Sequence, residues 1–228
     1  MKAVLRGGGI RALILDLDNT LYTHPAYAAF QEDVLVEALA RERGEDAATT
    51  AALLARMRAE REAAGLGRTS LGHLTAELGF DIATSVRWRE ELIEPADWLA
   101  PDPRLDGALG LLAGRFALAL VTNNPRSVGE KSLEALGARG RFAAVVGLDC
   151  TMESKPSPEP FRHAARLLGA EYGQCVSIGD RWDVDLAPAL ELGMGAILVE
   201  GVEEVYGLPE YFGVPRKRWI LRDIVGLP

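Results

Sequence analysis

The stretch Ala12-Leu13-Ile14-Leu15-Asp16-Leu17-Asp18-Asn19-Thr20 decides how this chain folds. Its four leading apolar residues show no polar alternation, which is typical of a strand buried on both faces. Two aspartates follow directly, although a carboxylate is rarely buried without a partner, because loss of water favours its neutral form. We therefore expect Asp16 and Asp18 to hold a divalent cation, to supply a nucleophile and a proton donor, or to do both.

Other apolar runs of similar length recur along the chain. Helical patterns separate the later runs, and each pattern is followed closely by a glycine, which is a stop signal for helices. This alternation predicts an α/β fold, with a Rossmann-like, doubly wound parallel sheet covered by helices on both faces. Residues 1–6, which precede Gly7-Gly8-Gly9, are expected to be poorly ordered. The further apolar runs lie at residues 116–121, 143–148, 175–178 and 196–199.

The segment from residue 22 to residue 98 does not fit this alternation. It contains two long and two shorter helical patterns, rich in Ala, Leu, Glu and Arg. A structureless connection of this length is improbable in a compact domain. We therefore predict a core domain made of residues 1–21 and 99–228, interrupted by a helical domain of residues 22–98.

The composition of the 228 residues disfavours several classes of partner. The formal net charge of −8 argues against broad nucleic-acid binding, which relies on a basic face, but says little against phosphorylated small molecules. No segment approaches the ~20 apolar residues of a membrane span, and no signal peptide is evident. Cys150 and Cys175 lack the Cys-x-x-Cys spacing and are expected to be reduced. We expect a cytoplasmic monomer or homodimer without nucleic-acid or membrane partners.

Polar residues follow the predicted strands at the ends where ligands bind in open α/β sheets. Acids at two strand ends make an oxygen-rich site, which suits the hard cation Mg²⁺. A threonine hydroxyl and a lysine add groups that bind phosphate. An aspartate can attack phosphorus, and a second carboxylate can protonate the leaving oxygen and then activate water. After Asp16 and Asp18, these residues are Thr122-Asn123-Asn124, Lys155-Pro156, and Gly179-Asp180 with Asp183 and Asp185 beyond.

Four motifs in this order resemble the haloacid dehalogenase-like superfamily of phosphohydrolases. They are Asp-x-Asp-x-Thr at residues 16–20, a strand-closing Thr122, Lys155-Pro156, and Gly179-Asp180 with a later acid. The helical residues between the first two motifs look like the C1-type cap of the subfamily that includes phosphoglycolate phosphatase and nucleotidases. The resemblance implies a phosphatase that hydrolyses a small phosphomonoester.

The resemblance also implies a role for each residue of the core motifs. Asp16 would be the nucleophile that forms an aspartyl-phosphate, and Asp18 the general acid and base. Asp16, Asp180 and the backbone carbonyl of Asp18 would bind Mg²⁺. The phosphoryl group of a small phosphorylated metabolite would be held by Thr122, Asn123 and Lys155.

Some assignments stay open at this point. Asp185 would support the metal site without being a direct ligand, although Asp183 competes for that role. Arg68 lies in a glycine-bounded loop that in similar proteins points at the active site, so it is a candidate contact for an anionic substrate. His24, Tyr27 and Phe30 are expected to pack within the cap. The alternatives are a phosphomutase resembling β-phosphoglucomutase and, with weaker support, a dehalogenase or a non-catalytic binding protein.

Overall fold

A six-stranded sheet forms the centre of the computed structural model, which describes residues 1–5, 9–65 and 71–214. The strand order is β1-β6-β5-β2-β3-β4, and every neighbouring pair is parallel except β1 and β6. The predicted α/β class with a doubly wound sheet is confirmed. The strands are β1 (Lys2–Val4), β2 (Ala12–Leu15), β3 (Ala117–Val121), β4 (Ala144–Val146), β5 (Cys175–Gly179) and β6 (Gly195–Leu198).

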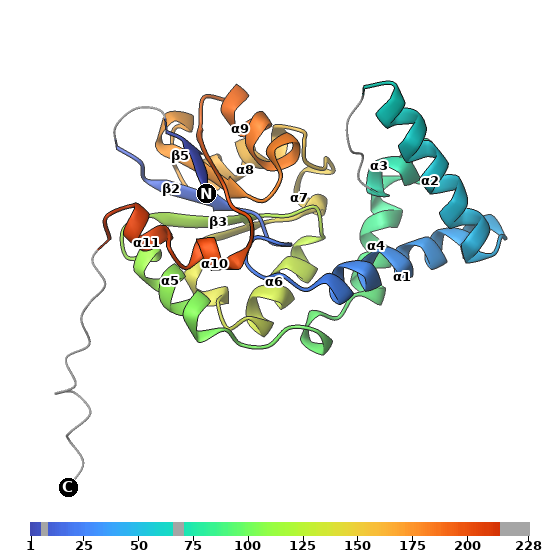
Figure 1. The fold of residues 1–228 in the computed structure, drawn as a ribbon, viewed down its shortest axis with the longest axis horizontal. Coiled ribbons are helices and arrows are strands. Elements are labelled where there is room, and N and C mark those ends of the chain that lie inside the picture. The colour runs from blue at the N-terminus through green and yellow to red at the C-terminus, as the bar shows by residue number, and fades with distance from the viewer. Residues whose placement is uncertain (6–8, 66–70, 215–228) are drawn as a thin grey trace, which may run out of the picture.

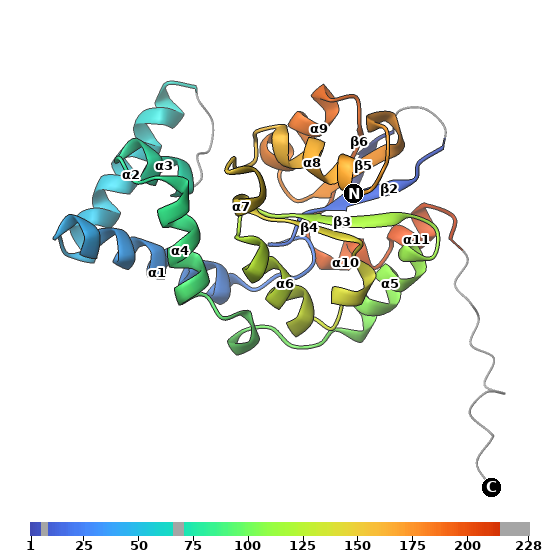
Figure 2. The same ribbon diagram turned by 180° about the vertical axis from the view of Figure 1, so that it is seen from behind.

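Helices cover both faces of this sheet, as Figures 1 and 2 show. Leu13 and Leu15 of β2 pack on one side, together with residues of α5, α6, α10 and α11. Ala12 and Ile14 point to the other side and pack with residues of α8 and α9. Both faces of β2 are therefore buried, which is why its sequence is continuously apolar. The helices around the sheet, including the short α7, are α5 (Pro103–Ala113), α6 (Arg126–Ala135), α7 (Leu148–Thr151), α8 (Glu159–Leu167), α9 (Ala187–Glu191), α10 (Val202–Val205) and α11 (Leu208–Tyr211).

The first strand corrects the expectation that residues 1–6 are poorly ordered. Lys2–Val4 form β1, which pairs antiparallel with β6 through the register Ala3 to Ile197. All three residues of β1 are exposed, so backbone pairing rather than burial places them. A three-residue exposed strand leaves no hydrophobic pattern, which is why sequence reasoning missed it.

Four helices between β2 and β3 form a separate cluster beside the sheet (Figure 2). They bury their own apolar residues, among them Leu39, Leu54, Leu74 and Trp88. Two of them begin after an aspartate, Asp46 or Asp81, whose side chain accepts a hydrogen bond from a backbone N–H of the first turn. Such a cap stabilises the helix because that N–H group would otherwise have no partner. These inserted helices are α1 (Pro25–Arg43), α2 (Ala47–Ala63), α3 (Leu71–Glu77) and α4 (Ile82–Leu92).

Aromatic rings hold together the two chain segments that join these helices to the sheet. Trp98, on the returning segment, stacks on Tyr27 with ring centroids 5.6 Å apart and lies 4.8 Å from Phe30. His24 meets the edge of Trp98 and caps α1 by accepting from the Tyr27 N–H. His24, Tyr27 and Phe30 therefore pack, but not within the inserted helices as predicted: Tyr27 belongs to the hydrophobic cluster of the sheet, and Phe30 packs against that cluster. None of the described helices combines the length and apolarity that crossing a bilayer requires.

Candidate active site

Three carboxylates converge at the carboxyl edge of the sheet. Asp16 directly follows β2, Asp180 directly follows β5, and Asp185 lies in a π-helical turn, η4 (Trp182–Leu186), which begins two residues after Asp180. One oxygen from each carboxylate lies within 4.8 Å of the others. The Asp16 N–H donates to the Ile178 carbonyl at 2.9 Å, so the parallel pairing of β2 with β5 carries Asp16 to this position.

Lys155 lies between two of these acids. Its Nζ is 2.5 Å from Asp16 Oδ1 and 2.5 Å from Asp185 Oδ1, and its side chain is only 3% exposed. Burial by itself would lower the pKa of Lys155, but the charges of Asp16 and Asp185 outweigh burial and raise that pKa. The lysine is therefore a fixed positive charge against the first aspartate.

The charges of this cluster do not balance within the protein. When all three carboxylates are ionised they face one ammonium group, which leaves two negative charges without a partner in the protein. Burial, together with the neighbouring Asp16 and Asp185 charges, raises the pKa of Asp180 to about 7. Burial also raises the pKa of Asp16 and of Asp185, although Lys155 opposes this. An all-oxygen site with two excess negative charges fits a divalent hard cation such as Mg²⁺.

The structure separates Asp185 from its competitor Asp183. Asp185 is buried: it accepts from the Arg181 N–H at 3.1 Å, and Ser177 Oγ of β5 donates to its carbonyl at 2.7 Å. Asp183 is half exposed and pairs with Arg181 on the surface. Only Asp185 reaches the carboxylate cluster, because the π-helical turn directs it inward.

The end of β3 supplies neutral polar groups. The buried Thr122 hydroxyl accepts from the Asn124 N–H at 3.1 Å, which leaves its own proton free to be donated. The Asn123 side chain pairs with the main chain of Lys155 in both directions, at 2.7 and 3.1 Å. The Asn123 side chain thus holds the lysine segment in place, and its contact with phosphate stays a prediction.

The Asp18 carboxylate points to a different set of groups from the Asp16 carboxylate. Tyr22 Oη donates to Asp18 Oδ1, and Gln31 Nε2 donates to the same oxygen at 3.1 Å. Asn124 Nδ2 donates to Oδ2 at 3.1 Å. Burial and the Asp18 charge raise the pKa of Tyr22, so its hydroxyl keeps its proton and remains a donor. Asp18 is therefore oriented by three donors.

Sequence reasoning missed Tyr22 and Gln31. A signal for Gln31 was present, because it follows Tyr27 by four residues and so shares the helix face that Tyr27 buries. A glutamine on a buried stripe needs a polar partner. Tyr22 gave no comparable signal, since its contact with Asp18 depends on the turn between them. That turn passes through Asn19, whose φ of 58° is left-handed, a conformation that asparagine tolerates better than most residues.

A buried cation lies among the inserted helices. Arg89 of α4 is 9% exposed, and its guanidinium donates to the Ser85 hydroxyl and carbonyl of its own helix. No carboxylate forms an ion pair with Arg89 in the part of the chain that the structure describes. Burial lowers its pKa to about 10, and the Asp18 charge opposes this. The predicted contact Arg68 lies outside the described residues.

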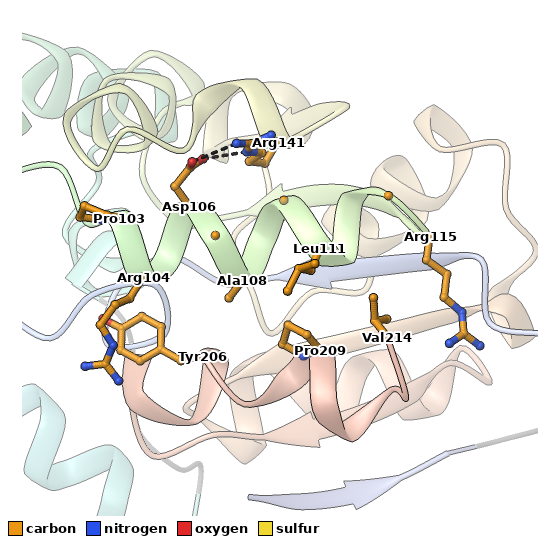
Figure 3. A pocket seen from close by; sticks show the side chains of 13 residues that line it. Pro103, Arg104, Asp106, Ala108, Leu111, Arg115, Arg141, Tyr206, Pro209 and Val214 are labelled. Carbon is orange, nitrogen blue, oxygen red and sulfur yellow. Dashed lines mark hydrogen bonds and ion pairs between the residues drawn. The ribbon is translucent and has the colours of Figure 1, made fainter. Parts of the chain in front are cut away.

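A hollow between α5 and the α10–α11 segment contains none of the predicted site residues (Figure 3). Its charged groups already have partners: Arg141 pairs with Asp106 at 2.7 Å, and Arg104 pairs with Glu203 at 3.0 Å and lies over the Tyr206 ring. Arg115 donates to the Phe212 carbonyl. Nothing in this hollow resembles the carboxylate cluster, so the chemistry is assigned to the sheet edge.

Comparison with known proteins supports the interpretation of the four sequence motifs. A family model described as haloacid dehalogenase-like hydrolase matches residues 10–193. A phosphoglycolate phosphatase from Rhodospirillum rubrum is 34% identical over 209 residues, which cover 83% of this chain and 79% of that protein.

Other matches are partial. A phosphoglycolate phosphatase from Neisseria meningitidis is 37% identical over 39% of each protein, and an N-acylneuraminate-9-phosphatase from Rattus norvegicus is 30% identical over 49% of this chain. These two matches span 39% and 44% of the relatives' own lengths.

Solved structures share the fold. A phosphatase from Thermococcus onnurineus matches with a TM-score of 0.63 and 20% identity, over 91% of this chain and all of that one. A β-phosphoglucomutase from Clostridium difficile matches with a TM-score of 0.54 and 19% identity, over 90% and 99%. At these identities the similarity concerns the fold alone. It therefore does not distinguish a hydrolase from a mutase.

Proposed function

Because the chain belongs to the haloacid dehalogenase-like hydrolase family, we propose that it is a Mg²⁺-dependent phosphatase that hydrolyses a small phosphomonoester. The observation that carries this proposal is the meeting of Asp16, Asp180, Asp185 and Lys155 in one cluster, in which three carboxylates face a single ammonium group. The named phosphatases among the relatives support it as well.

The proposed reaction begins at Asp16. Its carboxylate attacks phosphorus and forms an aspartyl-phosphate, while the bond to the leaving oxygen breaks. Lys155 and the Thr122 hydroxyl bind the phosphoryl oxygens, and Asn123 keeps the Lys155 segment in register. Mg²⁺, held by Asp16, Asp180 and the Asp18 carbonyl, would neutralise charge on the transferred group. Asp185 fixes Lys155 and supports the metal site.

Asp18 handles the protons in this proposal. It donates a proton to the leaving oxygen in the first step, which releases the alcohol. It then accepts a proton from water, and the resulting hydroxide attacks phosphorus of the aspartyl-phosphate to release inorganic phosphate and restore Asp16. Since Asp18 is held by Tyr22, Gln31 and Asn124 rather than by Lys155, the two aspartates occupy different environments suited to different roles.

Selection of the leaving group would fall to the inserted helices. We take residues 22–98 as a cap domain on a core of residues 1–21 and 99–228, the division the sequence predicted. Arg89 is the buried cation that this cap offers, and it favours a substrate with a second anionic group. The substrate is thus proposed to be a small phosphorylated metabolite.

Phosphate release tests the proposal. Purified protein with Mg²⁺ should release phosphate from 4-nitrophenyl phosphate and lose this activity with EDTA. Asp16→Asn should abolish turnover, whereas Asp33→Asn, an exposed acid on α1, should not change it. Retained turnover in Asp16→Asn would overturn the mechanism. Isomerisation of a sugar phosphate with negligible release of free phosphate would establish the mutase instead.

A further inference from the structure

Gln31 connects an inserted helix to the carboxylate proposed to transfer protons. It lies in the second turn of α1, at the end of that helix nearest the sheet (Figure 1). Its amide uses both ends: Nε2 donates to Asp18 Oδ1 at 3.1 Å, and Oε1 accepts from Asn124 Nδ2 at 3.2 Å. Asn124 Nδ2 also donates to Asp18 Oδ2 at 3.1 Å. Gln31, Asn124 and Asp18 therefore form a closed ring of hydrogen bonds.

The core side of this ring is rigid. Asn124 is buried, its N–H donates to Thr122 Oγ1, and its carbonyl accepts from the Leu148 N–H at 2.9 Å. Asp18 Oδ2 is thus held by a residue fixed to β3, whereas Oδ1 depends on Tyr22 and on Gln31. Gln31 is the one member of the ring that belongs to the inserted helices, so the position of α1 affects the orientation of Asp18.

The three hydrogen bonds that the Asp18 carboxylate accepts leave room for one further partner. An ionised carboxylate offers about four acceptor positions, and Tyr22, Gln31 and Asn124 fill three of them. One position is left, and it can carry the proton that passes to the leaving oxygen in the first step or accept a proton from water in the second. Without Gln31, the Asp18 side chain loses one of two restraints on Oδ1 and gains rotational freedom about its terminal torsion.

We propose that Gln31 is a positioning residue, which orients the Asp18 carboxylate for proton transfer and does so only while α1 is seated against the core. This assignment rests on the proposed phosphatase function and adds to it. It makes proton transfer depend on the placement of the inserted helices. Substrate bound between the helices and the sheet would therefore meet an aligned proton donor only when the helices are in place.

The test compares two esters that differ mainly in how much they need a proton donor. The leaving oxygen of phenyl phosphate would depart as phenolate, which is about as basic as an ionised tyrosine side chain. Its departure therefore requires protonation. The leaving group of 4-nitrophenyl phosphate is far less basic and departs with little help. The kcat/KM value covers the steps up to departure of the leaving group, so it reports on the proton donor directly.

The variants are Gln31→Met, which removes the hydrogen bonds to Asp18 and Asn124 and the longer one of 3.5 Å to Tyr22 Oη at similar volume, and Gln31→Glu, which keeps the shape but loses the donor to Asp18. For each, kcat/KM on phenyl phosphate should fall about tenfold or more, and on 4-nitrophenyl phosphate about threefold or less. The control Asp33→Asn lies on the same helix, is exposed, and has no hydrogen bond or ion pair among the described residues. It should leave both values and their ratio unchanged.

A merely structural role for Gln31 would lower both values by the same factor. Equal losses, or no loss, in folded variants with unchanged thermal midpoints would overturn the assignment while leaving the phosphatase intact. A wild-type chain that hydrolyses neither ester would overturn the proposed function and this assignment together. Should Gln31→Met fail to fold, the near-isosteric Gln31→Glu provides the same test: its loss of kcat/KM on phenyl phosphate is compared with its loss on 4-nitrophenyl phosphate.

Discussion

Gly179 and Asp185 approach each other so closely that a side chain at residue 179 has no room. A Cβ built on Gly179 would lie 2.5 Å from the Asp185 Cβ and 2.6 Å from its Cγ. Asp185 cannot retreat, because it is buried, its carbonyl accepts from Ser177, and its carboxylate pairs with Lys155. The glycine before Asp180 is thus needed for packing of the carboxylate cluster rather than for backbone freedom.

Gly179→Ala should therefore displace Asp185 and, with it, Lys155. We expect a loss of about 1–3 kcal/mol in the free energy of unfolding, measured with urea, and a fall in kcat larger than the change in KM. The matched control is Gly107→Ala on α5, where a Cβ meets nothing within 4 Å and stability should rise by about 0.5–1 kcal/mol. Equal stability of the two variants would contradict the packing argument.

Lys155→Met should leave two buried carboxylates without their cation. Loss of one partner of a buried pair costs about 3–5 kcal/mol, so urea unfolding at neutral pH should show a large destabilisation. Lys131→Met is the control, since its pair with Glu94 is exposed and worth about 0–1 kcal/mol. The deficit of Lys155→Met should shrink at pH 5, where the carboxylates take up protons more readily. A deficit that grows at pH 5 would contradict this.

Binding of Mg²⁺ should weaken as the pH falls. Burial and neighbouring acids raise the pKa of Asp180 to about 7 in the metal-free protein, so below pH 7 a proton occupies this carboxylate and competes with the cation. The apparent dissociation constant, measured by calorimetry, should rise about tenfold for each pH unit below 7 when one proton is displaced. A constant affinity between pH 5.5 and pH 8 would show that Asp180 does not bind the metal.

Arg89→Met should change substrate preference more than catalysis. If the buried guanidinium attracts a second anionic group, kcat/KM should fall at least about tenfold for phosphomonoesters that carry a carboxylate or a second phosphate. For phenyl phosphate the loss should be small. Arg87→Met, an exposed arginine on the same helix, is the control and should affect neither class. Equal losses on both classes would assign Arg89 to folding alone.

Local patterns accounted for the strands and for the core of the site. The continuous apolar run at 12–15 identified β2. Asp16, Thr122 and Asp180 could be placed directly after strands, and Lys155 in a loop at the same edge, because parallel strands all end at one edge. The inserted helices were evident from their periodicity and length. What failed was β1, which is too short and exposed to leave a pattern.

Other features needed coordinates. The choice between Asp183 and Asp185 depends on a π-helical turn, which sequence spacing does not reveal. The hydrogen-bond ring of Gln31, Asn124 and Asp18 joins residues 93 and 106 positions apart. Such contacts arise from how two folded units dock, and no local preference encodes them.

The sequence alone therefore predicted which polar residues meet at one edge of the sheet: two aspartates directly after a buried strand, then a threonine, a lysine and a further acid. Residue type and strand order suffice for that, because the carboxyl ends of parallel strands must meet. How each aspartate is held could be seen only in the folded chain. Asp16 faces Lys155, while Asp18 faces Tyr22, Gln31 and Asn124, since side-chain direction follows from packing between distant segments.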